Sequence, residues 1–372
     1  MSTPIDPIKA AAEPEPLEIG YIEAVMRDVY ALQASSLGPI FPGLGPTHWR
    51  FPGKGGIVFN AEKRFAFYLS EPFHAKWLEL GAFHFGAPTS IERPLNISRA
   101  HYVAFGWDRI IISDPYGGTY LLSGRFLLAW QALGEDSSFL GLPTSDRTDY
   151  PQGGRAQTFF GGIMIDWDDL GIVSLRTISV YFKGFICYGE TSDGLSNSDE
   201  PYFLFVSASG TDIRASATRI HEDVDAGDVR AEDILLWRGP PDGVEFALLL
   251  MEHDHGNPES YRHWLQDWTT AAYAGTAAGL ATLSGPATAL AFAASLGSAI
   301  PEITSAMGSA LGLDDDLVAE ARMVLTPHDL VRIGRDVQPW SERGIICNLL
   351  SPLMSGDGAS YRACFSVVID EV

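Results

Sequence analysis

The sequence predicts a mainly β protein with an α-helical insertion, in which tandem β-rich repeats are followed by a β-sandwich. Three observations lead to this prediction. Two stretches of about fifty residues repeat the same order of motifs in the N-terminal half. In the C-terminal half, short apolar strands alternate with acidic loops. A long segment without charged residues separates two of these strands.

The composition is that of a globular protein with room for two ordinary domains. The chain has 372 residues, of which 46% are hydrophobic and 19% are charged, so each half can bury a core. Its formal net charge of −22 repels phosphate backbones, so we expect no nucleic-acid partner. The three cysteines show no metal-binding or redox spacing, and we expect them to be small buried apolar residues. They are Cys187, Cys347 and Cys364.

Residues 1–20 are expected to form a flexible leader. Their first part lacks the apolar core of a secretory signal, and their second part is rich in Ala, Glu and Pro. We therefore expect a protein that is cytoplasmic or released without a conventional signal peptide. No uninterrupted run of roughly eighteen strongly apolar residues occurs, so no ordinary transmembrane helix is expected.

Residues 21–178 contain two clear copies of one motif order and a weaker copy before them. The first copy runs from Trp77-Leu-Glu-Leu-Gly81 through Phe85-Gly-Ala-Pro-Thr-Ser90 to Arg99-Ala-His-Tyr-Val-Ala-Phe105. The second runs from Trp130-Gln-Ala-Leu-Gly134 through Leu140-Gly-Leu-Pro-Thr-Ser145 to Arg155-Ala-Gln-Thr-Phe-Phe160. Each copy predicts a short helix ending at a left-handed glycine, a Gly-x-Pro-Thr-Ser turn and two short strands. One copy cannot bury its apolar face alone, so we expect the copies to stack.

These motifs resemble LGFP repeats. The match rests on Leu140-Gly-Leu-Pro-Thr-Ser-Asp146, Gly153-Gly-Arg155, Phe160-Gly-Gly162 and Trp167. The resemblance implies a module that attaches to cell-envelope glycan. Tryptophans are then candidate ligand-binding residues, because an indole ring can stack on a sugar ring. The candidates are Trp77, Trp107, Trp130 and Trp167. For Trp77 and Trp130, the alternative is a core position in the repeat helix.

Residues 179–372 predict an acidic β-sandwich. Strands are expected at 179–188, 202–207, 234–237 and 246–251, with a closing hairpin at 344–350 and 361–369. Carboxylates gather in the loops between these strands. Such carboxylates repel one another unless a cation lies between them, and calcium accepts six to eight oxygen ligands in flexible geometry.

The stretch Asp193-Gly-Leu-Ser-Asn-Ser-Asp199-Glu-Pro-Tyr202 is similar to the first calcium loop of the membrane-targeting β-sandwich of the synaptotagmin and protein kinase C type. In that family, two aspartates six residues apart precede Pro-Tyr. Glu252-His-Asp254 and Asp316-Leu-Val318 resemble the two halves of its third calcium loop. The resemblance implies calcium as a cofactor and a lipid surface as a partner. It implies the metal ligands Asp193, Asp199, Glu252, Asp254 and Asp316.

The insertion, at about 258–313, predicts a helical hairpin. No charged residue occurs between Asp267 and Glu302, and alanine is abundant there. Gly285-Pro286 divides the run into two arms, each shorter than a bilayer-spanning helix. The hairpin either packs against the sandwich or inserts into a membrane, and its small residues permit close helix packing in both settings.

The chain contains no nucleophile elbow, no phosphate-binding loop and no zinc-binding helix motif. We therefore expect a non-enzymatic, calcium-dependent binding protein that contacts cell-envelope glycan or a lipid surface. One alternative is a membrane-active, pore-forming toxin that uses the apolar hairpin. Another is a metal-dependent hydrolase in which His253 and His255 reach one metal, with His263 nearby in the sequence and no third ligand placed by spacing. The sequence does not predict the oligomeric state.

Overall fold

The computed structural model describes residues 18–190, 199–209, 212–253, 263, 316–336 and 340–371. In these residues the protein is mainly β, as predicted, with several antiparallel sheets and four α-helices. The chain divides into two compact units. Unit 1 comprises Met1–Arg147 and Thr158–Phe160, and unit 2 comprises Thr148–Gln157 and Gly161–Val372.

Unit 1 begins with helix α1 (Ile19–Leu37) and an antiparallel sheet in which neighbouring strands follow one another along the chain. The strands are β1 (Phe41–Gly45), β2 (His48–Phe51), β3 (Gly55–Asn60) and β4 (Phe65–Ser70). Ile22 and Met26 of α1 share a core with Ile57 and Phe59 of β3. Of the predicted leader, residues 1–17 lie outside the described residues, and α1 starts at Ile19.

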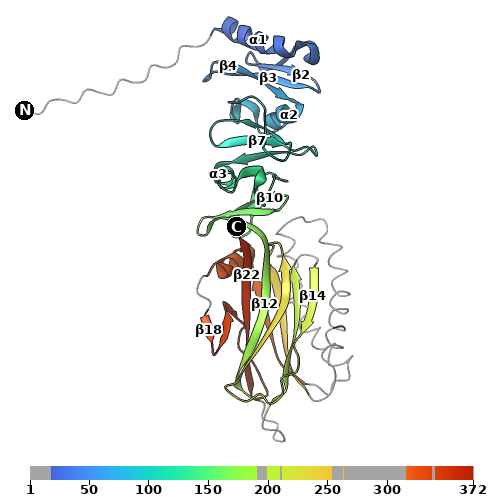
Figure 1. Ribbon diagram of the computed structural model, residues 1–372, viewed down its shortest axis with the longest axis vertical. Helices are drawn as coiled ribbons and strands as arrows, with labels where there is room; N and C mark the ends of the chain where they lie inside the picture. The colour runs from blue at the N-terminus through green and yellow to red at the C-terminus, as the bar shows by residue number, and fades with distance from the viewer. Residues whose placement is uncertain are drawn as a thin grey trace, which may run out of the picture. The chain divides into compact units, whose positions relative to one another are not determined.

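A second copy of this arrangement follows. It consists of α2 (Glu71–Glu79), η1 (Ala82–His84), β5 (Arg93–Pro94), β6 (His101–Ala104), β7 (Arg109–Ser113) and β8 (Thr119–Ser123). The next copy begins with α3 (Gly124–Ala132) and η2 (Glu135–Ser137). Helix α2 contacts β3 and β4 on one side and β7 and β8 on the other, so it lies between the two sheets (Figure 1). Its Trp77 shares a core with Val58 of β3 and Ile111 of β7. Stacking therefore buries faces that a single repeat would leave exposed.

The repeat helices end as the sequence predicts. Gly81 after α2 and Gly134 after α3 adopt φ angles of 95° and 103°. A residue with a Cβ atom is strained in this left-handed region, whereas glycine is not. The chain therefore turns sharply after each helix and leads into the Gly-x-Pro turn.

Unit 2 contains two larger antiparallel sheets and a small two-stranded ribbon. The first sheet holds β9 (Thr148–Tyr150), β10 (Gly154–Phe159), β11 (Gly162–Trp167), β12 (Gly171–Gly189), β15 (Val229–Gly239), β20 (Leu349–Leu350), β21 (Met354–Gly356) and β22 (Ala359–Glu371). The second holds β13 (Pro201–Ser209), β14 (Asp212–Ala217), β16 (Val244–Glu252) and β17 (Asp316–Leu325). Strands β18 (Trp340–Glu342) and β19 (Ile345–Cys347) form the ribbon, and α6 spans Pro327–Gly334.

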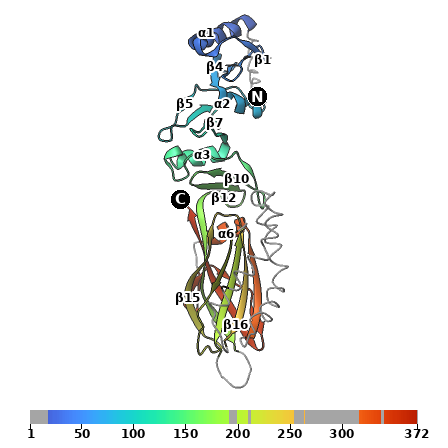
Figure 2. The same cartoon turned by 90° about the vertical axis from the view of Figure 1, so that its right-hand side faces the viewer.

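One hydrophobic core joins the two larger sheets. Phe182 of β12 packs against Phe203 and Phe205 of β13 and against Phe365 of β22. Figure 1 shows β12 beside β22, and Figure 2 labels β15 and β16, one strand from each sheet. Residues on both faces of β13 and β16 are buried, which explains why these strands read as continuous apolar runs and not as alternating ones.

Most strands predicted for the C-terminal half are present, with different limits. The strands predicted at 179–188, 202–207, 234–237, 246–251 and 361–369 lie within β12, β13, β15, β16 and β22. The one predicted at 344–350 is two short strands separated at Asn348, whose side chain hydrogen-bonds both backbone groups of Val367. The predicted module boundary at residue 178 lies inside β12, and the division between units falls earlier in the chain.

The helical insertion predicted at about 258–313 lies outside the described residues, apart from His263. Among the residues that are described, no helix has the length and apolar character needed to cross a membrane. The three cysteines are buried and reduced, as expected.

Candidate functional site

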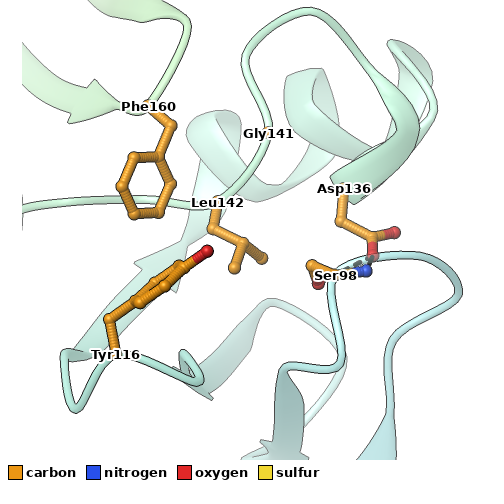
Figure 3. A pocket seen from close by; sticks show the side chains of 6 residues that line it. All are labelled: Ser98, Tyr116, Asp136, Gly141, Leu142 and Phe160. Atoms are coloured by element: carbon orange, nitrogen blue, oxygen red, sulfur yellow. Dashed lines mark hydrogen bonds between the residues drawn. The ribbon is translucent and has the colours of Figure 1, made fainter.

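The candidate site is a pocket of about 380 Å³ in unit 1. This volume lies at the lower end of the range for small-ligand pockets, roughly 300–1,000 Å³. Turns and loops that follow β5, β7, α3 and β10 supply its lining. The lining residues are Ser98, Tyr116, Asp136, Gly141, Leu142 and Phe160 (Figure 3).

One wall of the pocket is aromatic. Tyr116 is 83% exposed and Phe160 is 58% exposed, and their rings meet edge to face at a centroid distance of 5.9 Å. Asp114 Oδ1 accepts the backbone amides of Tyr116 and Gly118 at 2.7 and 2.9 Å, which fixes the turn that carries Tyr116. Two exposed rings held side by side offer an apolar surface at little conformational cost.

The opposite wall is polar. Figure 3 shows Ser98 and Asp136 across the pocket from the two rings, with Leu142 between them. Asp136 Oδ2 accepts three hydrogen bonds of 2.8 Å, from the amides of Ile97 and Ser98 and from the Ser98 hydroxyl. In the described part of the chain, the buried Oδ1 atom of Asp136 has no hydrogen-bond partner.

Asp136 carries its charge in this setting. Burial alone would raise its pKa, but the hydrogen bonds from Ser98 and Ile97 outweigh burial and hold the pKa below the usual value for aspartate. The polar wall therefore presents a carboxylate that is ionised at neutral pH, beside the hydroxyl of Ser98. Because the Ser98 hydroxyl donates its proton to Asp136, its oxygen can accept a hydrogen bond from a ligand.

Backbone pairing sets the position of Phe160. Its amide donates to the carbonyl of Leu142 at 3.0 Å, and two residues further on the amide of Thr144 donates to the carbonyl of Thr158 at 2.9 Å. A bridge between Pro143 and Phe159 lies between these bonds. The segments 142–144 and 158–160 thus run antiparallel, and the side chains of Leu142 and Phe160 lie at the pocket end.

Three of the four candidate tryptophans lie in the core. Trp77 and Trp130 are completely buried, and Trp167 is 1% exposed. Trp167 Nε1 donates to the carbonyl of Pro151 at 3.0 Å. These three rings have no open face for a sugar in this structure. Trp107 is 83% exposed and is the one candidate whose ring faces solvent.

The residues predicted to bind calcium are brought together in part. Glu252 at the end of β16 pairs with Asp316 at the start of β17 and, on its other side, with Pro201 of β13. Glu252 Oε1 accepts the amide of Glu200 at 2.7 Å. Asp199 is 1% exposed and accepts the Tyr361 hydroxyl at 2.6 Å.

The remaining calcium candidates cannot be placed. Asp193, Asp254 and the side chain of Asp316 lie outside the described residues, as does His255 of the hydrolase alternative. Within the described ranges, no three His, Cys, Asp or Glu side chains come together in a metal-binding arrangement.

The sequence motifs do not identify the pocket. Phe160 belongs to a repeat motif, but nothing in the motifs singles out Ser98, Tyr116 or Asp136 as site residues. The backbone hydrogen bonds from Thr89 to Ala104 and from Thr144 to Thr158 place Phe160 where the preceding copy has Gly106, an equivalence that alignment of the motifs at their arginines does not give. Comparison of the chain with models of known protein families gives no match, and comparison with curated proteins gives none either.

Proposed function

We propose that unit 1 is a non-catalytic carbohydrate-binding module that holds cell-envelope glycan in the pocket between Tyr116 and Asp136. The observation that carries this proposal is the pairing of two exposed rings with a polar wall across one cavity. A sugar ring has an apolar face of C–H groups and a rim of hydroxyls. The rings of Tyr116 and Phe160 suit the face, and the hydroxyl oxygen of Ser98, held in place by Asp136, suits the rim.

We further propose that the unit is built from LGFP-like repeats. Two geometric equivalences support this proposal. The indole N–H groups of Trp77 and Trp130 bond to the first glycine of their own Gly-x-Pro turns. The left-handed glycines Gly81 and Gly134 also stand at the same place after their helices.

The experiment is co-sedimentation of the full chain with purified peptidoglycan, followed by calorimetric titration with soluble peptidoglycan fragments. Tyr116→Ala and Phe160→Ala should each weaken binding about tenfold or more, the effect expected for an anchor ring that contributes roughly 1.4 kcal/mol or more. Phe41→Ala is the matched control, because Phe41 is 45% exposed in the same unit and does not line the pocket. Binding that survives both pocket substitutions would show that the pocket is not the site.

As a second candidate function, we propose a calcium site at the end of β16 in unit 2. The pairing of Glu252 with Asp316 supports it, because this register brings two of the five predicted ligands to neighbouring strand ends. Carboxylates on adjacent positions repel one another unless a cation or a proton is shared. This site would serve attachment to a glycan or lipid surface, with no catalytic step.

A further inference from the structure

A cluster of three hydroxyl groups lies next to the pocket. Thr144 Oγ1 donates to Thr158 Oγ1 at 2.9 Å, and Thr158 Oγ1 donates to Ser145 Oγ at 2.9 Å. The amide of Thr158 also donates to Ser145 Oγ, at 3.1 Å. Thr158 is exposed, and Thr144 and Ser145 are half-buried. All three belong to unit 1.

The backbone ladder described above joins this hydroxyl cluster to the pocket. Leu142 and Phe160 pair at the pocket end, and Thr144 and Thr158 pair two residues further along. Side chains two residues apart on an extended strand point to the same face, about 7 Å from each other. In agreement, Thr158 and Phe160 are both exposed while Phe159 between them is buried. The hydroxyl cluster therefore continues the exposed face of the aromatic wall.

The preceding repeat shares one bond of this backbone ladder and carries neither the hydroxyl cluster nor a ring at the position of Phe160. Thr89 corresponds to Thr144, and its amide donates to the carbonyl of Ala104, which stands in place of Thr158. The amide of Gly106, in place of Phe160, donates to Thr89 Oγ1 at 3.0 Å. The Thr89 hydroxyl thus accepts a backbone amide there, and the position equivalent to Phe160 is a glycine without a ring. The hydroxyl cluster is therefore not a requirement of the Gly-x-Pro-Thr-Ser turn.

We propose that the hydroxyl cluster is a second subsite, so that the ligand of unit 1 is a chain of at least two linked sugar units and not a single sugar. This inference rests on the proposed function. The first unit lies against Tyr116 and Phe160, and the next lies over Thr144 and Thr158.

The chemistry of the hydroxyl cluster suits this role. Its hydrogen bonds form a chain that runs from Thr144 to Thr158 to Ser145. Successive bonds in such a chain polarise and so strengthen one another. In the described part of the chain, Thr144 Oγ1 donates one bond and accepts none, so it can accept a hydrogen bond from a sugar hydroxyl. The hydroxyl cluster carries no charge, so it selects for a neutral sugar unit with hydroxyl groups.

The experiment is calorimetric titration of the full chain with the monomer, dimer and trimer of the peptidoglycan glycan strand. The wild type should bind the dimer about tenfold more tightly than the monomer, the effect of one or two neutral hydrogen bonds. Thr144→Val and Thr158→Ala should remove most of this gain and leave monomer affinity unchanged. Ala104 already occupies the position equivalent to Thr158 on the same ladder, so the second substitution is compatible with the fold.

Thr119→Val is the matched control, because Thr119 lies on β8 in the same unit and makes only a 3.5 Å contact through its hydroxyl. Equal affinity of the wild type for monomer and dimer would overturn the second subsite and leave the proposed function standing. Retention of the dimer gain by both variants would overturn the second subsite in the same way. Failure of every fragment to bind the wild type would overturn the proposed function, and the second subsite with it.

Discussion

Trp77 and Trp130 occupy the same position in consecutive repeats and make the same hydrogen bond. Trp77 Nε1 donates to the carbonyl of Gly86 at 2.7 Å, and Trp130 Nε1 donates to that of Gly141 at 2.8 Å. Both side chains are fully buried. Gly141 also lines the pocket, so the bond from Trp130 connects the core of the repeat directly to the candidate site.

Replacing either tryptophan by alanine should destabilise unit 1 by roughly 3–5 kcal/mol, because the change removes a large buried side chain and leaves a cavity. Trp130→Phe keeps much of the apolar contact but strands the carbonyl of Gly141, so its cost should be smaller, about 1–3 kcal/mol. Urea unfolding followed by tryptophan fluorescence and circular dichroism measures these differences. Trp107→Ala is the control and should change stability little, since that ring is 83% exposed. A Trp130→Ala variant as stable as the wild type would contradict the core assignment.

A buried histidine pair between β2 and α2 makes unit 1 sensitive to acid. His48 and His74 are almost inaccessible to solvent, and their Nε2 atoms lie 2.8 Å apart. His48 Nδ1 accepts the amide of Leu44 at 3.0 Å, so the proton of that ring is on Nε2 and is donated to His74. Desolvation lowers the pKa of each ring to about 4, with a further contribution from the positive charge of Arg50.

Between about pH 6.5 and pH 4, the two rings are therefore neutral in the folded protein and protonated in the unfolded chain. Because the folded pKa lies below the unfolded value of 6.5, stability should fall as the pH drops from about 6.5 to about 4. The loss should approach roughly 3 kcal/mol for each histidine. Urea unfolding at several pH values measures it. His74→Met should make stability less dependent on pH in this range, whatever the variant does to stability at pH 7. If the variant keeps the pH dependence of the wild type, the histidine pair is not the source of that dependence.

Calcium should raise the thermal stability of unit 2 if the proposed site is correct. A ligand present at a hundred times its dissociation constant adds about 2.7 kcal/mol, or a few degrees in melting temperature at this size. Melting curves of the full chain in calcium, in magnesium and in chelator provide the measurement. Glu252→Gln should abolish the calcium effect, whereas Glu62→Gln, a change on an exposed residue of unit 1, should not. Identical curves in calcium and chelator would remove the case for the site.

The strands that flank the insertion end side by side, since Glu252 pairs with Asp316. A short connection can therefore close the gap, and loop-closure cost changes only slowly with length. Replacing residues 258–313 with a short Gly-Ser linker should leave the sheets of unit 2 folded, as judged by circular dichroism and a cooperative melt. The same variant tests the pore-forming alternative through dye release from liposomes. Leakage caused by the wild type and lost in the variant would support that alternative, and a variant that fails to fold would show that the segment is part of the core.

The sequence predicts features that depend on short-range pattern better than it predicts the site. The ends of the repeat helices can be predicted because a helix that stops abruptly is usually followed by a glycine in the left-handed conformation. Gly81 and Gly134 adopt this conformation. The pocket is not predictable in this way because Ser98, Tyr116, Asp136 and Phe160 come from four separate segments, and only the tertiary fold of unit 1 brings them together. The sequence favours tryptophan as the sugar-binding residue, but a large apolar ring also suits the core, and the repeat uses Trp77 and Trp130 there.

The contrast between Gly106 and Phe160 bears on how strongly the protein can hold a polymer. In the described part of unit 1, the turn scaffold occurs twice but carries the ring and the hydroxyl cluster once. A single molecule would then engage a glycan strand in a monovalent way, with no gain in avidity from its repeats. If the proposed function is correct, the repeats contribute one contact to attachment. A second contact on the earlier turn would need more than a change of side chains, because Gly106 adopts a φ angle of 97° that strains any residue with a Cβ atom.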